Sequence, residues 1–206
     1  MRHPGTVARY TTAARINHWI TAACLILLAL SGLSLFHPAL FFLTDLFGGG
    51  PATRAIHPWF GTVLLVSFAI LFIRFARHNL WEREDTRWMG AIRRVLTNDE
   101  EHVPEVGRYN GAQKLVFWLM TLLILLLFAS GIVIWDQYFF GYTSIDQKRL
   151  ATVVHSAAAV IIISVWITHV YAALWVKGSV RAMMQGDVTA GWSWRHHRKW
   201  LREGDR

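Results

Sequence analysis

The sequence predicts an all-α integral membrane protein whose chain folds into a bundle of four transmembrane helices. Of its 206 residues, 54% are hydrophobic and only 17% carry a charged side chain, whereas a soluble domain usually contains about 25% charged residues. The apolar residues are also gathered into four long stretches, each close to the roughly 20 residues that a helix needs to cross a bilayer. Composition and pattern therefore both favour a lipid environment.

The four predicted spans follow one another along the chain with polar segments between them. They cover residues 16–36, 56–75, 115–135 and 150–176. His37-Pro38 and the Gly-Gly-Gly-Pro run at 48–51 interrupt the first connection, because Pro and Gly are poorly suited to continuing a helix. No internal repeat is visible, so residues 1–206 are expected to form a single membrane domain.

Lys and Arg are distributed unevenly between the predicted connections. All 21 except Arg54, Lys148 and Arg149 lie on one side of the predicted bundle, and cationic loops are retained in the cytoplasm. Both termini, the loop 76–114 and the tail 177–206 are therefore expected to be cytoplasmic, as in a multi-pass protein of the bacterial inner (cytoplasmic) membrane. The net charge of +8 then reflects orientation and contact with anionic lipid headgroups, not nucleic-acid binding.

Four of the ten histidines lie inside the predicted spans: His18, His57, His155 and His169. The others lie in loops, tails or span ends, where a solvated imidazole is expected: His3, His37, His78, His102, His196 and His197. A histidine in the hydrocarbon region costs free energy unless its ring is hydrogen-bonded or binds a metal. The four intramembrane histidines are therefore candidate metal ligands.

The direction of each span places these four histidines at two depths. His57 and His155 come early in spans that begin at the outer face, so they are expected to pair there. His18 comes early in a span that begins at the cytoplasmic face, and His169 comes late in a span that ends there. These two are expected to form a second pair, near the cytoplasm.

The spacing of two histidines on the fourth span adds a second constraint. His155 and His169 are 14 residues apart, so in a helix their rings lie within about 40° of one face and about 21 Å apart along the axis. One helix thus offers a ligand at each of two levels, which predicts two b-type haems, each held by two histidines. Small residues four positions after each histidine would admit a flat porphyrin: Ala22, Gly61, Ala159 and Ala173.

The intramembrane histidines also allow other interpretations. Each could instead hydrogen-bond a neighbouring helix, which would make the chain a haem-free membrane anchor. A di-iron oxygenase would need several closely spaced histidine pairs, and a metal transporter would usually place Asp or Glu beside them; the predicted spans contain neither feature. Cys24 is the only cysteine, which excludes an iron–sulfur cluster and covalent haem attachment within the chain.

Five segments form a specific combination that extends over nearly the whole chain. They are Arg-Ile-Asn-His-Trp at 15–19, Ile-His-Pro at 56–58, Gly-Arg-Tyr-Asn-Gly-Ala-Gln-Lys at 107–114, His-Val-Tyr-Ala-Ala-Leu-Trp-Val-Lys-Gly at 169–178 and His-His-Arg-Lys-Trp at 196–200. Together they resemble the gamma subunit, a cytochrome b, of respiratory membrane-bound formate dehydrogenase.

The resemblance implies an electron-transfer subunit that does not itself oxidise formate. It would anchor a molybdenum or tungsten catalytic alpha subunit and an iron–sulfur beta subunit, and pass electrons through an outer and then an inner haem b to menaquinone or a related quinone. It assigns His57 and His155 to the outer haem, and His18 and His169 to the inner one. The cytochrome b of a nickel–iron hydrogenase or of a sulfur-compound reductase is the alternative in this class.

The resemblance also implies a quinone site at the start of the third span. Its residues would be Asn110, Gly111, Ala112, Gln113 and His169. Amide side chains can both donate to and accept from a quinone oxygen. The same two amides also have the spacing of a capping box that begins a helix. Both roles stay open here, and they are compatible because a helix N-terminus favours negative charge on a reduced quinone.

Overall fold

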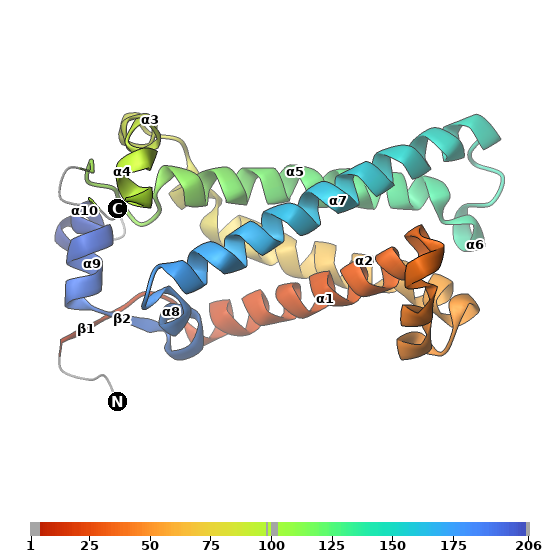
Figure 1. The fold of residues 1–206 in the computed structure, drawn as a ribbon, viewed down its shortest axis with the longest axis horizontal. Coiled ribbons are helices and arrows are strands. Elements are labelled where there is room, and N and C mark those ends of the chain that lie inside the picture. Colours follow the sequence, from red (N-terminus) through yellow and green to blue (C-terminus); the bar gives the residue numbers. More distant parts are fainter. Residues whose placement is uncertain (1–4, 98, 100–102, 205–206) are drawn as a thin grey trace. The chain divides into compact units, whose positions relative to one another are not determined.

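The computed structural model describes residues 5–97, 99 and 103–204. His3 and His102, expected above to be solvated, lie outside this part of the chain. Figure 1 labels the helices and strands in chain order.

Four long helices are the main elements of the fold: α1 (Thr12–Phe36), α2 (Gly50–Phe75), α5 (Gly111–Ile134) and α7 (Ile145–Trp175). Each is long and apolar enough to cross a membrane, which confirms the four predicted spans. Each helix begins roughly one to two turns before its predicted apolar stretch, because its first turns are more polar than the part that lipid would surround.

Polar caps explain where two of the long helices begin. At the start of α1 the Ala14 N–H donates to the Thr11 hydroxyl, at 3.3 Å. Before α7 the Ser144 N–H donates to Gln147 Oε1 at 2.8 Å, and the Gln147 N–H donates to Ser144 Oγ at 3.3 Å. This reciprocal pattern is a capping box, which satisfies backbone donors that lack a partner in the helix.

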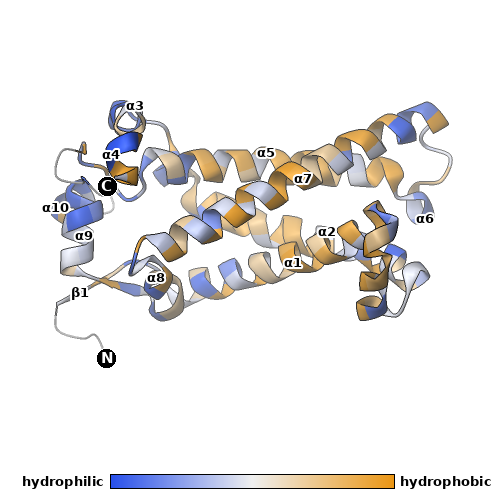
Figure 2. Ribbon diagram, viewed as in Figure 1, coloured by the Kyte–Doolittle hydropathy of each residue, from blue (hydrophilic) through white to orange (hydrophobic). Residues whose placement is uncertain are grey.

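Large apolar side chains cover the outside of the long helices. Figure 2 shows these helices coloured mostly as hydrophobic, whereas α3 and α10 are largely hydrophilic. Ile73 is 80% exposed, Leu174 66% and Val66 58%. An apolar surface of this extent is unusual for a soluble protein and indicates contact with lipid.

Shorter elements occupy the connections and the tail. They are β1 (Thr6–Ala8), η1 (Pro38–Phe47), η2 (Ala76–Asn79), α3 (Arg83–Gly90), α4 (Ile92–Leu96), α6 (Asp136–Phe139), α8 (Ser179–Gln185), β2 (Asp187–Thr189), α9 (Ala190–His196) and α10 (Arg198–Glu203). Strands β1 and β2 pair antiparallel, with Val7 opposite Val188. This small sheet was not predicted from the sequence, because strands of three residues carry too little alternation to be recognised.

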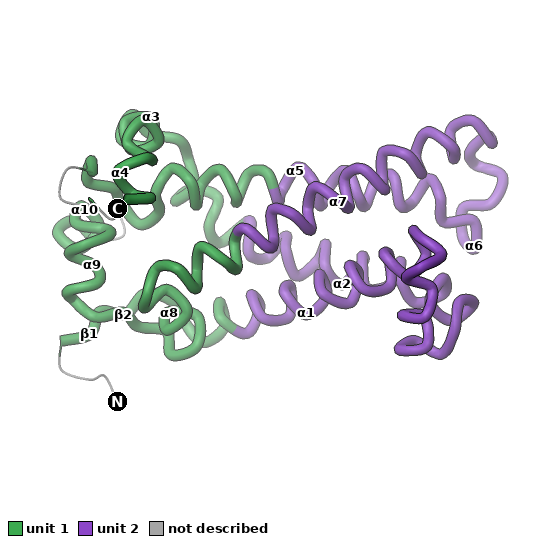
Figure 3. Tube along the Cα trace, in the orientation of Figure 1, with its two compact units in different colours: residues 1–15, 73–119, 169–206 green, residues 16–72, 120–168 purple. Residues whose placement is uncertain are grey.

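The chain divides into two compact units, which Figure 3 colours separately. Unit 1 comprises Met1–Arg15, Ile73–Leu119 and His169–Arg206, and unit 2 comprises Ile16–Phe72 and Met120–Thr168. Within unit 1, Ala182, Val188 and Trp200 form a buried cluster against which Val7 and Tyr10 pack. This cluster joins the N-terminal arm to the C-terminal tail.

Candidate metal centre

His57 on α2 and His155 on α7 lie side by side within unit 2. Their ring centroids are 6.3 Å apart and their ring planes meet at 67°. The structure therefore brings together the two histidines that the direction of the spans had placed at one depth. Their role as metal ligands stays a prediction.

The separation of the two rings suits one metal ion held between them. Each ring would have to present one nitrogen about 2 Å from a shared metal ion, and rings whose centroids are 6.3 Å apart are close enough to do so. Within the described ranges, no three His, Cys, Asp or Glu side chains gather into a metal site. A porphyrin provides four nitrogens and leaves two axial positions for histidines.

A serine from another helix holds each of these rings. The Nδ1 atom of His57 is 2.7 Å from Ser31 Oγ on α1, and the Nδ1 atom of His155 is 3.0 Å from Ser130 Oγ on α5. Each hydroxyl donates its single proton to the backbone carbonyl four residues earlier, at 2.7 Å in both cases. With that proton directed at the carbonyl, the serine oxygen is placed to accept from the ring. Nδ1 then carries the proton, and Nε2 keeps the lone pair that a metal requires.

A glycine follows each serine and lies against the same ring. A Cβ atom at Gly32 would stand 3.3 Å from Cε1 of His57, and one at Gly131 would stand 3.5 Å from Cε1 of His155. Gly32 thus lets α1 approach the ring that Ser31 contacts, whereas a Cβ at Gly131 would be in ordinary van der Waals contact with the ring of His155. Neither Ser-Gly pair, at 31–32 or at 130–131, was predicted from the sequence, although the repeated dipeptide inside two apolar runs was an available signal.

The other two intramembrane histidines belong to different units. His18 on α1 is part of unit 2, where its ring packs edge-on against Trp19 with centroids 5.4 Å apart, whereas His169 on α7 is part of unit 1. Beside His18, the Asn17 amide donates to the Ser67 carbonyl at 3.0 Å, and the Ser67 hydroxyl donates to Asn17 Oδ1 at 2.7 Å. This polar contact fixes α1 against α2. The pairing of His18 with His169 stays a prediction.

Asn110 and Gln113 form a capping box at the start of α5. The Asn110 N–H donates to Gln113 Oε1 and the Gln113 N–H donates to Asn110 Oδ1, both at 3.0 Å. The capping interpretation is therefore confirmed. Gly111 is buried between them and Ala112 is half-buried. Quinone binding by these residues and by His169 stays a prediction.

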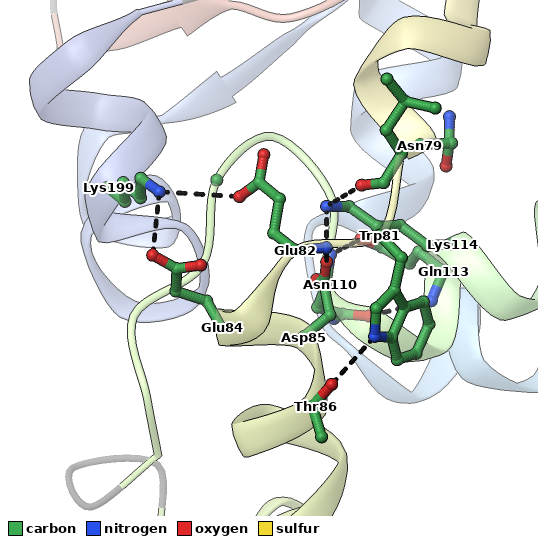
Figure 4. A network of polar contacts seen from close by, with 12 residues as sticks. Asn79, Trp81, Glu82, Glu84, Asp85, Thr86, Asn110, Gln113, Lys114 and Lys199 are labelled. Carbon is green, nitrogen blue, oxygen red and sulfur yellow. Dashed lines mark hydrogen bonds and ion pairs between the residues drawn. The ribbon is translucent and has the colours of Figure 1, made fainter.

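An ion pair fastens the start of α5 to the segment around α3, as Figure 4 shows. The Lys114 ammonium donates to the Asp85 carboxylate at 2.7 Å and to the Leu80 carbonyl at 2.9 Å. In the same figure Lys199 reaches Glu84 at 3.3 Å and Glu82 at 3.6 Å. The tail and the loop before α5 are thereby linked.

The residues just before the capping box are held by the N-terminal arm and the tail. The Arg9 guanidinium donates to the Arg108 carbonyl at 2.7 Å, and Nδ1 of His197 is 2.9 Å from the Gly107 carbonyl. His197 is only 1% exposed, so the expectation that it is solvated was wrong. Burial, and secondly the neighbouring Arg9, lower the pKa of His197 well below its usual range. The neutral ring donates from Nδ1 to the carbonyl.

Comparison with known families identifies the family to which this chain belongs. The family model described as prokaryotic cytochrome b561 matches residues 9–186, which include all four long helices. The chain belongs to the prokaryotic cytochrome b561 family. As a member of this family it is a multi-pass membrane cytochrome b, and its cofactor is haem b.

Three relatives are similar to this cytochrome b561-family chain along most of their length. The cytochrome b556(fdo) subunit of formate dehydrogenase from Escherichia coli K12 is 45% identical over 203 residues, which cover 98% of this chain and 95% of the relative. The nitrate-inducible cytochrome b556(Fdn) subunit from the same strain is 39% identical over 189 residues, covering 92% and 87%. The formate dehydrogenase cytochrome b556 subunit of Haemophilus influenzae is 38% identical over 197 residues, covering 96% and 83%. The resemblance noted in the sequence is confirmed.

Proposed function

We propose that the chain is the di-haem subunit of a respiratory formate dehydrogenase complex in the bacterial inner membrane. It anchors a molybdenum or tungsten alpha subunit and an iron–sulfur beta subunit, and it conveys their electrons to menaquinone or a related quinone. Formate is oxidised in the partner, not here. The relatives favour this donor over a nickel–iron hydrogenase or a sulfur-compound reductase.

The observation that carries the proposal is the contact of two intramembrane histidines from different helices. Haem b bound by two histidines supplies one-electron transfer and offers no open axial position to oxygen or substrate. His57 and His155, with centroids 6.3 Å apart, would hold the outer haem. His18 and His169 would hold the inner one. Small residues one turn away would leave space beside the four ligands: Ala22, Gly61, Ala159 and Ala173.

The proposed quinone site lies at the start of α5 and includes Asn110, Gly111, Ala112, Gln113 and His169. Gln113 is exposed and Asn110 is half-buried, so both amides are partly accessible although their oxygens cap the helix. The amide N–H groups can donate to a quinone oxygen. The positive end of α5 favours the negative charge that develops as a quinone is reduced. With both termini in the cytoplasm, this end of α5 would face the cytoplasm. The protons that convert the reduced quinone to quinol would then come from the cytoplasm.

Spectra of single histidine variants in the co-purified complex test the proposal. His57→Ala and His155→Ala should remove one component of the reduced-minus-oxidised spectrum, and His18→Ala and His169→Ala should remove the other. His37→Ala is the matched control, because this exposed histidine caps η1 through Nδ1. Loss of the same component in His57→Ala and His18→Ala would contradict the pairing. A partner other than a formate-oxidising subunit would contradict the assignment to formate dehydrogenase.

A further inference from the structure

We infer that Ser31 and Ser130 are positioning residues that orient the ligands of the outer haem and lower its midpoint potential. This inference rests on the proposed role of His57 and His155 as ligands. It adds two residues on α1 and α5, so that all four long helices would contribute to one redox centre.

Both serines are removed from solvent. Ser31 is 0% exposed and Ser130 is 7% exposed, so water does not compete for their oxygens. Because a carbonyl of the same helix accepts each hydroxyl proton, the arrangement fits a hydrogen bond from Nδ1–H of each histidine to Oγ. A ring held in this way can neither flip nor exchange its tautomer without losing that bond.

Back-bonding of serine to its own helix does not by itself explain the arrangement. Serines in apolar helices commonly donate to the carbonyl one turn earlier, and Ser34 shows this on α1, where it is 1% exposed and donates to the Ser31 carbonyl at 2.6 Å. Ser31 and Ser130 differ because each oxygen also lies at Nδ1 of a histidine and each is followed by a glycine beside the same ring. The same arrangement of serine and glycine therefore occurs on two helices, once beside each histidine of the pair.

The hydrogen bond from each histidine would shift the midpoint potential of a bound metal in a definite direction. An imidazole whose N–H donates to an oxygen is a more basic ligand through its other nitrogen. A more basic ligand stabilises ferric iron relative to ferrous iron, so it lowers the midpoint potential. Removing one acceptor should therefore raise the potential of that haem and leave the other haem unchanged.

The experiment is a redox titration, followed optically, of the co-purified complex carrying Ser31→Ala or Ser130→Ala. Both variants should move the same spectral component, the one lost in His57→Ala, to a higher potential. We expect up to a tenfold change in the ferric-to-ferrous ratio at a fixed potential, which is about 59 mV for one electron. Ser31→Thr retains a hydroxyl that can bond the same carbonyl and should titrate near the wild type. Ser34→Ala is the matched buried control and should shift neither component.

A second substitution covers the case in which an alanine variant does not assemble. Ser31→Cys keeps the size of the side chain but offers a weaker acceptor, so it should move the potential in the same direction. Unmoved potentials in the alanine or cysteine variants, or an equal shift in Ser34→Ala, would overturn this inference while the wild-type haem bands still supported the proposed function. A wild-type complex without haem bands would overturn both.

Discussion

The Nζ atom of Lys114 and the carboxylate of Asp85 are 2.7 Å apart, and the two side chains are only 5% and 2% exposed. The pair joins the first turn of α5 to the first turn of α3. It stands directly after the capping box of Asn110 and Gln113. The position of the proposed quinone site therefore depends on a salt bridge that water does not reach.

Removing one member of this pair should destabilise the protein strongly. Asp85→Asn leaves the Lys114 ammonium buried without its counter-charge, which typically costs about 3–5 kcal/mol. Lys199→Met is the matched control, because Lys199 is 29% exposed and its partners Glu82 and Glu84 are 53% and 40% exposed. It should cost at most about 1 kcal/mol. Thermal unfolding of the purified protein in detergent measures both, and equal unfolding temperatures would contradict the prediction.

The packing of Gly111 gives a second prediction. A Cβ atom there would stand 2.9 Å from Met89 Cγ and 3.0 Å from the Asp85 carbonyl oxygen, so Gly111→Ala should lower the free energy of unfolding by about 1–3 kcal/mol. Gly107→Ala is the control, because a Cβ there meets no atom within 4 Å, and it should stay within about 0.5 kcal/mol of the wild type. Met89→Ala should rescue Gly111→Ala only in part, since the backbone oxygen remains. Full rescue would show that the oxygen contact is unimportant.

The transmembrane part of the fold could be predicted because its constraints are simple. A helix needs about 20 apolar residues to cross a bilayer, and the cations in the connections predict the direction of each span. Depth alone was therefore enough to pair His57 with His155. The rotation of each helix could not be predicted in this way, because α1 and α5 are apolar on all sides and have no stripe that identifies an inner face. Ser31 and Ser130 were missed for that reason.

The extramembrane contacts were harder to foresee because they join distant parts of the chain. The carbonyl that accepts from His197 belongs to Gly107, 90 residues earlier, and the nearby Arg9 is 188 residues away. The spacing of residues that are close together in the sequence cannot predict such a contact. A histidine between Arg and polar residues was therefore expected to be solvated, and tertiary packing buried it instead.

Buried His197 should make the stability of the protein depend on pH. The folded state keeps this ring neutral because burial and Arg9 lower its pKa, whereas in the unfolded chain the ring takes up a proton as the pH falls through about 6.5. The unfolded state then binds more protons, so the free energy of unfolding falls below that pH, by up to about 1.4 kcal/mol per pH unit.

Comparison with two variants isolates this contribution in unfolding experiments between pH 8 and pH 5. His197→Asn retains an N–H donor for the Gly107 carbonyl and does not titrate, so the stability of this variant should fall less steeply with acidification than that of the wild type. His37→Asn, at an exposed position, should keep the wild-type slope. A wild-type slope in His197→Asn would mean that the ring is not buried as a neutral imidazole.

The capping role of Asn110 and its proposed role in quinone binding can be separated by a substitution that keeps only the first. Asn110→Ser retains an oxygen that can cap α5 but removes the amide N–H that would donate to quinone. Its stability should match the wild type, and its quinol formation should be slower by roughly two- to tenfold, since one neutral hydrogen bond contributes about 0.5–1.5 kcal/mol. Asn110→Ala should show the same slowing and also lose about 1 kcal/mol of stability with the cap.

Ser144→Ala removes the equivalent cap of α7 and should lower stability without slowing quinol formation. Quinol formation by the purified complex with formate as donor measures the rates, and haem reduction should stay complete in every variant. A wild-type rate of quinol formation in Asn110→Ser would show that the amide only caps the helix. It would contradict the proposed quinone site at the start of α5.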